Sequence, residues 1–344
     1  MKTILVTGGA GFIGSHTCLA LLKKQYKIKV VDSFINSNPN SLKRVKKICD
    51  LSNIPFNLEI IEADLRDNYI IDNIFYQAKN INQPIEGVIH FAGLKAVNDS
   101  VKNPLVYWDA NLNSSINLLK AMGKNDCRTI VFSSSATVYG LSENKYFKES
   151  DYLSPINPYG HTKLAIENLL RNLYDSSPDE WRVINLRYFN PIGAHESGLI
   201  GENPNGKPNN IFPLILQVAS GKIPKLKIFG SDWETIDGTG VRDYIHVMDL
   251  AEGHLLALEY LFQRGGMYDI NIGTGKGTSV LELIKTFQRV TNISFSYEFT
   301  SRRYGDIARI VADNSLVKSI LGWRPKKNLA DMCTDGWRWQ QNIS

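Results

Sequence analysis

The 344-residue chain has only four cysteines and no long apolar run. Cys18, Cys49, Cys127 and Cys333 are far apart and form no C-x-x-C pair, so neither a zinc site nor a disulfide framework is expected. We therefore expect no metal and a reducing compartment, by default the cytoplasm. Because no 18-residue apolar run occurs and no signal peptide precedes the first apolar strand, we expect no membrane segment.

The chain also lacks a strong excess of either charge. It has 39 Lys and Arg residues against 34 Asp and Glu residues, which gives a net charge of +5. This small excess does not call for nucleic acid as a partner, although it suits an anionic small substrate. The hydrophobic fraction of 43% excludes a disordered or collagen-like chain.

Strand-like and helix-like segments alternate over the first 135 residues. Strands are predicted at 2–7, 27–31, 57–63, 87–91 and 129–133, and helices at 14–24, 69–78 and 107–122. Alternation of helices with strands that are apolar on both faces predicts an α/β, Rossmann-type doubly wound parallel sheet. Beyond a helix at 159–174 and a strand at 181–186 the pattern breaks. We expect one domain over 1–190 and a smaller mixed region over 191–344, with about 240–260 returning to the first.

A glycine-rich turn, Thr7-Gly8-Gly9-Ala10-Gly11-Phe12-Ile13-Gly14, lies between the first strand and the first helix. Gly11 would let a pyrophosphate approach the backbone, Gly14 would let the helix pack on the sheet, and the helix N-terminus would face the phosphates. Asp32 ends the next strand, where it would bind the adenosine ribose hydroxyls and repel a 2′-phosphate. The pattern predicts NAD rather than NADP as cofactor, and a purely structural turn is the alternative.

A second motif places Tyr159 and Lys163 four residues apart, on one face of a predicted helix. An ammonium beside a phenol favours the phenolate and lowers the phenol pKa, so Tyr159 could act as a base near neutral pH. Ser133, Ser134 and Ser135 end the fifth predicted strand, and ligands bind outside such strand ends. A surface pair and a serine-rich turn are the alternatives.

Four longer stretches are more specific than the glycine motif: Phe91–Val97, Ser133–Gly140, Leu186–Pro191 and Gly240–Leu250. With the two motifs above they resemble the UDP-glucose 4-epimerase family of extended short-chain dehydrogenases/reductases over essentially the whole chain. The resemblance implies reversible 4-epimerisation of UDP-glucose and UDP-galactose through a 4-keto sugar. It also implies tightly bound NAD, a UDP-hexose substrate, a Rossmann domain with a smaller substrate domain, and a homodimer.

The resemblance assigns roles to individual residues. Ser135, Tyr159 and Lys163 would be catalytic. The implied cofactor contacts are Gly8, Gly11, Phe12, Ile13, Gly14, Asp32, Asn36, Asp64, Leu65, Phe91, Ala92, Gly93, Lys95, Asn111, Ser133, Tyr159, Lys163 and Tyr188. The implied substrate contacts are Lys95, Ser135, Tyr159, Asn190, Asn210, Ile211, Phe229, Arg242, Arg303, Asp306 and Ile310. Arg242 and Arg303 could pair with the UDP phosphates, with surface solvation as the alternative.

Some positions depart from the family pattern. Ala110 stands where some members have asparagine, and Tyr304 stands where an acidic residue can occur. Ile310 occupies a position where family members with tyrosine tend to exclude N-acetylhexosamines. UDP-glucose and UDP-galactose are therefore expected as the main pair, with measurable activity on UDP-N-acetylglucosamine. The Gly/Pro-rich loop over 191–210 is expected to help close the site.

Two other functions are compatible with the same fold. A nucleotide-sugar 4,6-dehydratase needs an additional acid and base, usually an acidic pair after the serine position, but Val138 and Tyr139 follow here. A non-catalytic NAD-binding protein is also possible on this fold. Such proteins commonly lack the complete set of Ser, Tyr and Lys that this chain retains.

Overall fold

The computed structural model describes all residues except 143, 204, 205, 207, 209, 304, 305 and 344, so Tyr304 lies outside the described residues. The chain divides into two compact units. The first contains Met1–Gly140, Leu153–Arg187 and Ala251–Ile270, and the second contains Leu141–Tyr152, Tyr188–Leu250 and Asn271–Ser344. The segment that returns to the first unit is thus Ala251–Ile270, where the sequence suggested about 240–260, and a short excursion over 141–152 joins the second unit.

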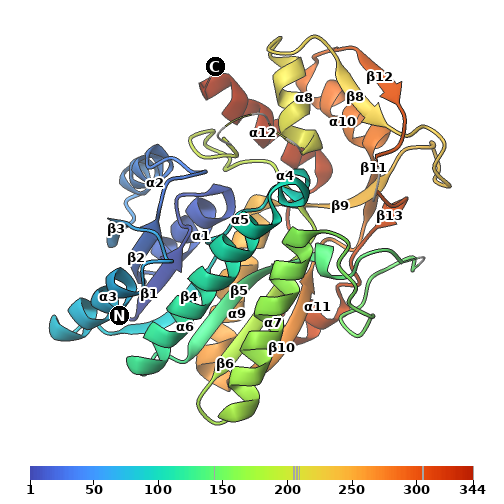
Figure 1. Cartoon of the computed structure of the whole chain (residues 1–344). Coiled ribbons are helices and arrows are strands. Elements are labelled where there is room, and N and C mark those ends of the chain that lie inside the picture. Colours follow the sequence, from blue (N-terminus) through green and yellow to red (C-terminus); the bar gives the residue numbers. More distant parts are fainter. Residues whose placement is uncertain (143, 204–205, 207, 209, 304–305, 344) are drawn as a thin grey trace. The chain divides into compact units, whose positions relative to one another are not determined.

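The first unit is built on a seven-stranded sheet in the order β10-β6-β5-β4-β1-β2-β3 (Figure 1). Its strands are β1 (Thr3–Thr7), β2 (Lys27–Asp32), β3 (Leu58–Glu62), β4 (Ile85–His90), β5 (Thr129–Ser135), β6 (Arg182–Tyr188) and β10 (Gly266–Ile272). The pairings β1–β2, β2–β3, β1–β4 and β4–β5 are parallel. This confirms the α/β, doubly wound fold. The strand order reverses between β1 and β4, and ligands bind such sheets outside the carboxyl ends of the strands at that point.

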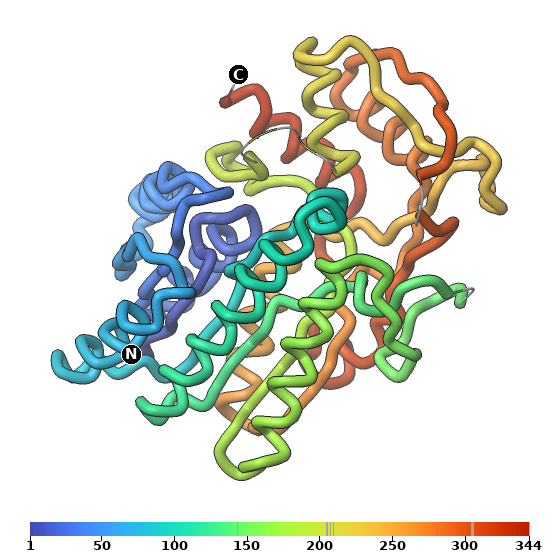
Figure 2. The backbone as a smooth tube through the Cα atoms, in the orientation of Figure 1, coloured from blue at the N-terminus to red at the C-terminus, as the bar shows by residue number. Residues whose placement is uncertain are grey.

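Helices cover both faces of this sheet. The ribbon and the tube both show α3 (Asn68–Asn80), α6 (Ser114–Lys124) and α7 (Pro158–Ser176) side by side on one face (Figures 1 and 2). Buried residues of these helices, including Phe75, Leu118 and Ile166, share a core with Val88 and Phe132 of the sheet. The other face carries α1 (Phe12–Lys23) and α9 (Val247–Arg264). The remaining helices of this unit are α2 (Asn40–Leu51), α4 (Val97–Lys102) and α5 (Pro104–Trp108).

The described residues of the second unit form a separate core and two small sheets. β9 (Val241–His246) pairs in parallel with β7 (Asn190–Ile192) and β13 (Arg309–Ile310), and antiparallel with β11 (Gly277–Ser279). β8 (Leu226–Phe229) pairs in parallel with β12 (Tyr297–Thr300). The helices are α8 (Ile211–Ala219), α10 (Val280–Thr291), α11 (Ser315–Leu321) and α12 (Leu329–Ile343), and the core contains Phe212, Phe287 and Met332. Within the described part of the chain, no helix is long and apolar enough to cross a membrane.

Candidate active site

The glycine-rich turn joins β1 to α1 at the carboxyl edge of the sheet. Gly8 has φ +68°, and a Cβ atom there would lie 2.7 Å from the backbone nitrogen of Ala92, so only glycine fits against the end of β4. A Cβ at Gly14 would lie 2.3 Å from the Gly8 carbonyl oxygen, which explains why the first turn of α1 needs a second glycine. The backbone can therefore pass close to a ligand on this edge.

The N-terminus of α1 presents unpaired backbone donors at the same turn. Along α1, the first N–H group that donates to a carbonyl of the turn is that of Ser15, which bonds the Gly11 carbonyl at 2.9 Å. Among the described residues, the N–H groups of Phe12, Ile13 and Gly14 have no backbone partner. Three such donors at the positive end of a helix form an anion site that suits a pyrophosphate.

Asp32 is buried at the end of β2, beside this turn. Its carboxylate accepts hydrogen bonds from the Ala10 N–H at 2.9 Å, the Phe34 N–H at 3.0 Å and the Ser37 hydroxyl at 2.7 Å. Asn36, implied as a ribose contact, is exposed, and the neighbouring Ser37 is the side chain that holds Asp32. The sequence motif did not single out Ser37, because its spacing from Asp32 belongs to a loop rather than to a regular element.

Two more of the implied cofactor residues follow β3. Asp64 and Leu65 come after the strand, and Leu65 is buried. Arg66 donates to the Asp64 carboxylate at 2.6 Å and to Asp109 at 2.7 Å, and the first of these contacts lowers the Asp64 pKa. The Asp64 carboxylate is thus an ionised acceptor at the same edge as Asp32.

Asn111 lies in a π-helical turn, Asp109–Asn113, between α5 and α6. The single helix predicted at 107–122 is therefore interrupted. The Asn111 side chain accepts from the Leu94 N–H at 2.7 Å and donates to the Thr162 hydroxyl at 2.9 Å. These bonds join the loop after β4, which carries Phe91, Ala92, Gly93 and the exposed Lys95, to the helix that carries Tyr159. π-Helical turns within α-helices often occur at functional sites. Ala110 lies in the same turn.

Ser135, Tyr159 and Lys163 are brought to one place, on β5 and on the first two turns of α7. Asn157 caps α7, with its side chain accepting from the Gly160 N–H at 2.9 Å, so the helix starts just before Tyr159. The Lys163 ammonium donates to the Ser133 carbonyl at 2.8 Å and lies 5.8 Å from the centre of the Tyr159 ring. All three of these side chains are buried or nearly so.

Ser135 has a defined hydrogen-bond direction. Its oxygen accepts from the Thr137 hydroxyl at 3.0 Å and from the Thr137 N–H at 3.3 Å. A hydroxyl oxygen that already accepts two bonds still has its own proton to donate. Ser135 is therefore set up as a donor toward a reacting oxygen.

Burial determines the charge states at this site. It lowers the pKa of Lys163 from 10.5 to about 8, and Glu167 acts in the opposite direction. Burial, and secondarily the Lys163 charge, lower the pKa of His90 from 6.5 to about 3. His90 is thus neutral at physiological pH, where its ring bonds Thr7 at 2.7 Å and Ser115 at 2.9 Å.

The second unit brings five of the eleven implied substrate contacts together. Ile310 on β13 is the register partner of Arg242 on β9. The Arg242 guanidinium donates to the Ile307 carbonyl at 2.9 Å, and burial lowers its pKa. Arg303 pairs with Asp306 at 2.9 Å and lies 4.7 Å from the centre of the Phe229 ring. The result is a cationic and aromatic cluster, suited to a phosphate and a planar base.

The remaining implied contacts lie on other elements. Asn190 begins β7, opposite Tyr244 of β9, and Asn210 is the exposed N-cap residue of α8 with Ile211 beside it. Among the described residues, the Asn210 side chain makes no capping hydrogen bond at the start of α8. Tyr188 is the last residue of β6.

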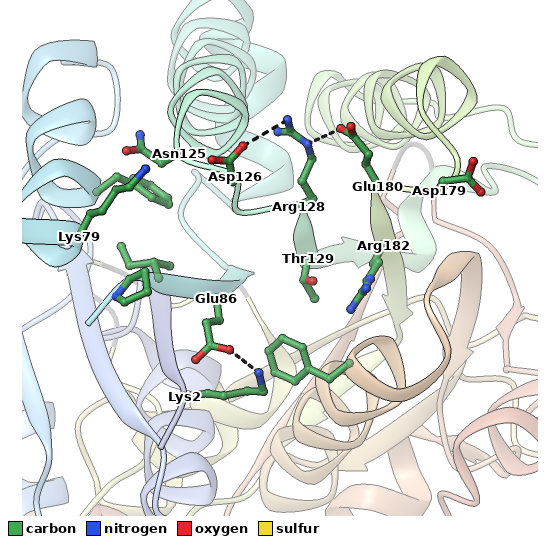
Figure 3. Close-up of a pocket in the computed structure, with 14 residues that line it drawn as sticks. Lys2, Lys79, Glu86, Asn125, Asp126, Arg128, Thr129, Asp179, Glu180 and Arg182 are labelled. Atoms are coloured by element: carbon green, nitrogen blue, oxygen red, sulfur yellow. Dashed lines mark hydrogen bonds and ion pairs between the residues drawn. The ribbon is translucent and has the colours of Figure 1, made fainter. Parts of the chain in front are cut away.

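A hollow of about 590 Å³ lies elsewhere, at the amino ends of β1, β4, β5 and β6 (Figure 3). Its charged residues largely pair with one another, Lys2 with Glu86 and Arg128 with Glu180. It is therefore at the edge of the sheet opposite the glycine-rich turn, and it is not the cofactor crevice.

The sheet, the glycine-rich turn with Asp32, and the buried Ser, Tyr and Lys set define a dinucleotide-binding protein of the short-chain dehydrogenase/reductase class. Residues 5–336 match the family described as GDP-mannose 4,6 dehydratase. A UDP-glucose 4-epimerase of Bacillus subtilis is 51% identical over 98% of this chain and 97% of its own length. A UDP-glucose 4-epimerase of Neisseria meningitidis is 47% identical over 99% of this chain and 98% of its own length.

Solved structures agree with these relatives. The UDP-glucose 4-epimerase of Stenotrophomonas maltophila, with bound NAD and formylated UDP-arabinopyranose, matches at a TM-score of 0.95 and 43% identity, covering 100% of this chain and 99% of that one. The Bifidobacterium longum enzyme, in complex with NAD+ and UDP, matches at 0.92 and 43%, covering 99% and 98%. The chain belongs to the UDP-glucose 4-epimerase family, which confirms the resemblance found in the sequence.

Proposed function

We propose that the protein is an NAD-dependent isomerase that interconverts UDP-glucose and UDP-galactose at C4. The observation that carries this proposal is the buried Lys163 ammonium, 5.8 Å from the Tyr159 ring, on the helix that faces Ser135. The family supplies the reaction, because its members named above are UDP-glucose 4-epimerases. A 4,6-dehydratase is disfavoured, since no acidic pair follows Ser135.

The residues of the first unit suit the proton steps of this reaction. Tyr159, ionised beside the Lys163 ammonium, takes the proton of the sugar 4-hydroxyl. Ser135 donates its proton toward the same oxygen, since its own oxygen already accepts from Thr137. NAD supplies the hydride chemistry at C4 when it is bound. Tyr159 then returns the proton to the 4-keto oxygen after the sugar has turned its other face, and the C4 configuration is inverted.

We assign NAD to the crevice at the carboxyl ends of β1 and β4. The unpaired N–H groups of Phe12, Ile13 and Gly14 would hold the pyrophosphate, and Asp32 would hold the adenosine ribose. Asp32 is buried and fixed by Ser37, so a 2′-phosphate there would meet an immobile negative charge. The remaining implied contacts of the first unit, from Asp64 to Lys163, belong to the end of β5 or to the segments that follow β3, β4 and β5, including the first two turns of α7.

We assign the UDP moiety to the cationic cluster of the second unit. Arg242 and Arg303 would bind the phosphates and Phe229 the uracil, with Asp306 orienting Arg303. Ile310, beside Arg242, would contact the hexose, and its size allows some activity on N-acetylated UDP-sugars. A relative from Campylobacter jejuni, 33% identical, is described as a UDP-Glc/GlcNAc 4-epimerase.

We also propose a homodimer and a reducing, cytoplasmic location. Three apolar side chains on α4 and α5 are strongly exposed: Val101 at 61%, Leu105 at 81% and Val106 at 54%. Such an apolar cluster on adjoining helices suits a self-complementary interface. All four cysteines are buried free thiols, which suits a reducing compartment.

The test is incubation with UDP-galactose and a coupled assay for UDP-glucose. Wild-type protein should form UDP-glucose without added NAD, whereas a dehydratase would release a 4-keto-6-deoxy sugar. Tyr159→Phe should lower turnover by about a hundredfold or more, the usual contribution of a general base. Tyr174→Phe, the same change further along α7, is the matched control and should leave turnover near that of wild type. Normal turnover in folded Tyr159→Phe would place the base elsewhere.

A further inference from the structure

A second charged group lies one helical turn beyond Lys163, and the mechanism above does not use it. Glu167 continues the face of α7 that carries Tyr159 and Lys163, since the three residues are spaced by four. Its carboxylate is buried and meets the Arg187 guanidinium through three contacts of 2.6, 3.0 and 3.2 Å. It also accepts from the Ser134 hydroxyl at 2.5 Å.

Arg187 extends this network to two further elements of the first unit. Its guanidinium donates to the Tyr139 hydroxyl at 3.2 Å and pairs with Asp269 of β10 at 3.2 Å. Asp269 in turn accepts from Asn185 at 2.8 Å. One buried pair thus joins α7 to β5, β6 and β10.

Stability alone is a weak reason for this arrangement. Removing two charges from water costs energy that their attraction often only repays, and well-packed apolar side chains can replace a buried pair without loss. Here the pair is anchored to Ser134, between the Ser133 carbonyl that holds Lys163 and the catalytic Ser135. Its position therefore affects the site in both geometry and charge.

We propose that Glu167 and Arg187 are positioning residues for the proposed reaction. Glu167 fastens the serine end of β5 to α7 and keeps a negative charge one turn from the Lys163 ammonium, while Arg187 fixes the orientation of that carboxylate. The inference rests on the proposed function, because it concerns the same Ser135, Tyr159 and Lys163.

The charges around Lys163 give the direction of the effect. Tyr159 and Glu167 face it from its own helix and His90 faces it from β4, while Arg187 of β6 pairs with Glu167 and with Asp269. β5 contributes the Ser133 carbonyl and the Phe132 ring, 4.8 Å away. Burial lowers the Lys163 pKa, and the Glu167 charge opposes that change. Without the charge, Lys163 would lose its proton at a lower pH.

Glu167→Gln removes the charge and keeps the shape and an acceptor for Ser134. In the NAD-loaded enzyme, the alkaline limb of the pH profile of kcat should move down by about one pH unit, since a nearby opposite charge commonly shifts a pKa by one to three units and Arg187 cancels part of it. KM should change little. Glu180→Gln, at the half-exposed pair with Arg128, is the matched control and should leave the limb in place.

A second readout does not depend on epimerisation. The free energy of unfolding is measured with urea, on protein freed of NAD, for wild type and for Lys163→Met. The difference between the two should change with pH over the range in which Lys163 titrates. In the Glu167→Gln background this change should begin about one pH unit lower. An inactive wild type would refute the proposed function only, whereas an unmoved Lys163 titration would refute this inference.

A double variant covers the case in which Glu167→Gln fails to fold. Glu167→Gln combined with Arg187→Met removes a negative and a positive charge together. The net electrostatic field at Lys163 therefore changes less than it does in Glu167→Gln alone. The alkaline limb of the double variant should lie below that of wild type by less than the roughly one pH unit expected for Glu167→Gln. A double variant that folds and binds NAD but loses its alkaline limb altogether, or shifts it by more than about one pH unit, would overturn the proposal.

Discussion

Replacing Lys163 with methionine removes the buried charge beside Tyr159 and nearly preserves the side-chain length. The Lys163 ammonium lies 5.8 Å from the centre of the Tyr159 ring. At that separation and an effective dielectric constant of about 20, two unit charges attract by about 3 kcal/mol, which is about two pKa units. The phenolate of Tyr159 should therefore become that much harder to form in Lys163→Met.

This loss should change the pH profile of kcat in two ways. The acidic limb should move up by about two pH units, so turnover at a pH below the wild-type limb should fall about a hundredfold. The alkaline limb should disappear. In wild type, burial lowers the Lys163 pKa to about 8, and activity should decline above that value as the ammonium loses its proton.

The assay is saturating UDP-galactose with coupled detection of UDP-glucose, from about pH 6 to pH 10. NAD content and circular dichroism of each variant would separate loss of cofactor or fold from loss of proton transfer. Lys120→Met on α6 is a matched control with an exposed lysine and should reproduce the wild-type profile. If folded, NAD-loaded Lys163→Met kept both limbs at their wild-type positions, Lys163 would not be the group that activates Tyr159.

Three further results should follow from the structure. NAD, not NADP, should be released from the purified protein on denaturation, and Asp32→Asn should weaken NAD binding about tenfold or more in a calorimetric titration, as expected for a lost bond to a charged group; release of NADP would contradict this assignment. Burial lowers the His90 pKa from 6.5 to about 3, so the folded state binds fewer protons at this residue than the unfolded state does. The contribution of neutral His90 to stability is therefore complete above pH 6.5 and is lost as the pH falls toward 3. Urea unfolding of His90→Gln should accordingly show a shallower acid dependence than wild type, and equal slopes would argue against a neutral His90. Finally, Ile310→Tyr should suppress activity on UDP-N-acetylglucosamine selectively, by about tenfold or more, whereas an unchanged preference would mean that Ile310 does not gate the pocket.

Features held within one contiguous segment were readable from the sequence. The glycine-rich turn is one example, because its two essential glycines are set by contacts within the turn and with the end of the neighbouring strand. The pairing of Tyr159 with Lys163 is another, since helical spacing alone puts them on one face. The parallel sheet with helices on both faces also followed from the alternation of strands and helices, whereas the order of the strands was not predicted.

Features that depend on pairs distant in sequence were not readable. The helix predicted at 107–122 breaks at Asn111 because its side chain bonds Leu94 and Thr162, 17 residues before it and 51 after it. Apolar periodicity carries no sign of such bonds, so the pattern predicts a continuous helix. The local cost of the π-helical turn is offset only once the fold brings the three segments together.

The Glu167–Arg187 pair shows the same limit at the catalytic face. In the sequence, Glu167 is an ordinary acidic residue of a helix and Arg187 a charged residue in an apolar strand, 20 positions apart. Charged residues are almost never fully buried unless paired, so nothing local predicts that both side chains are. Burial changes what they can do, because a charge shielded from solvent acts at close range with little screening. The motif Tyr-x-x-x-Lys therefore predicts the proposed base and its ammonium, whereas the carboxylate proposed to hold the charge of that ammonium is found only where α7, β5 and β6 meet.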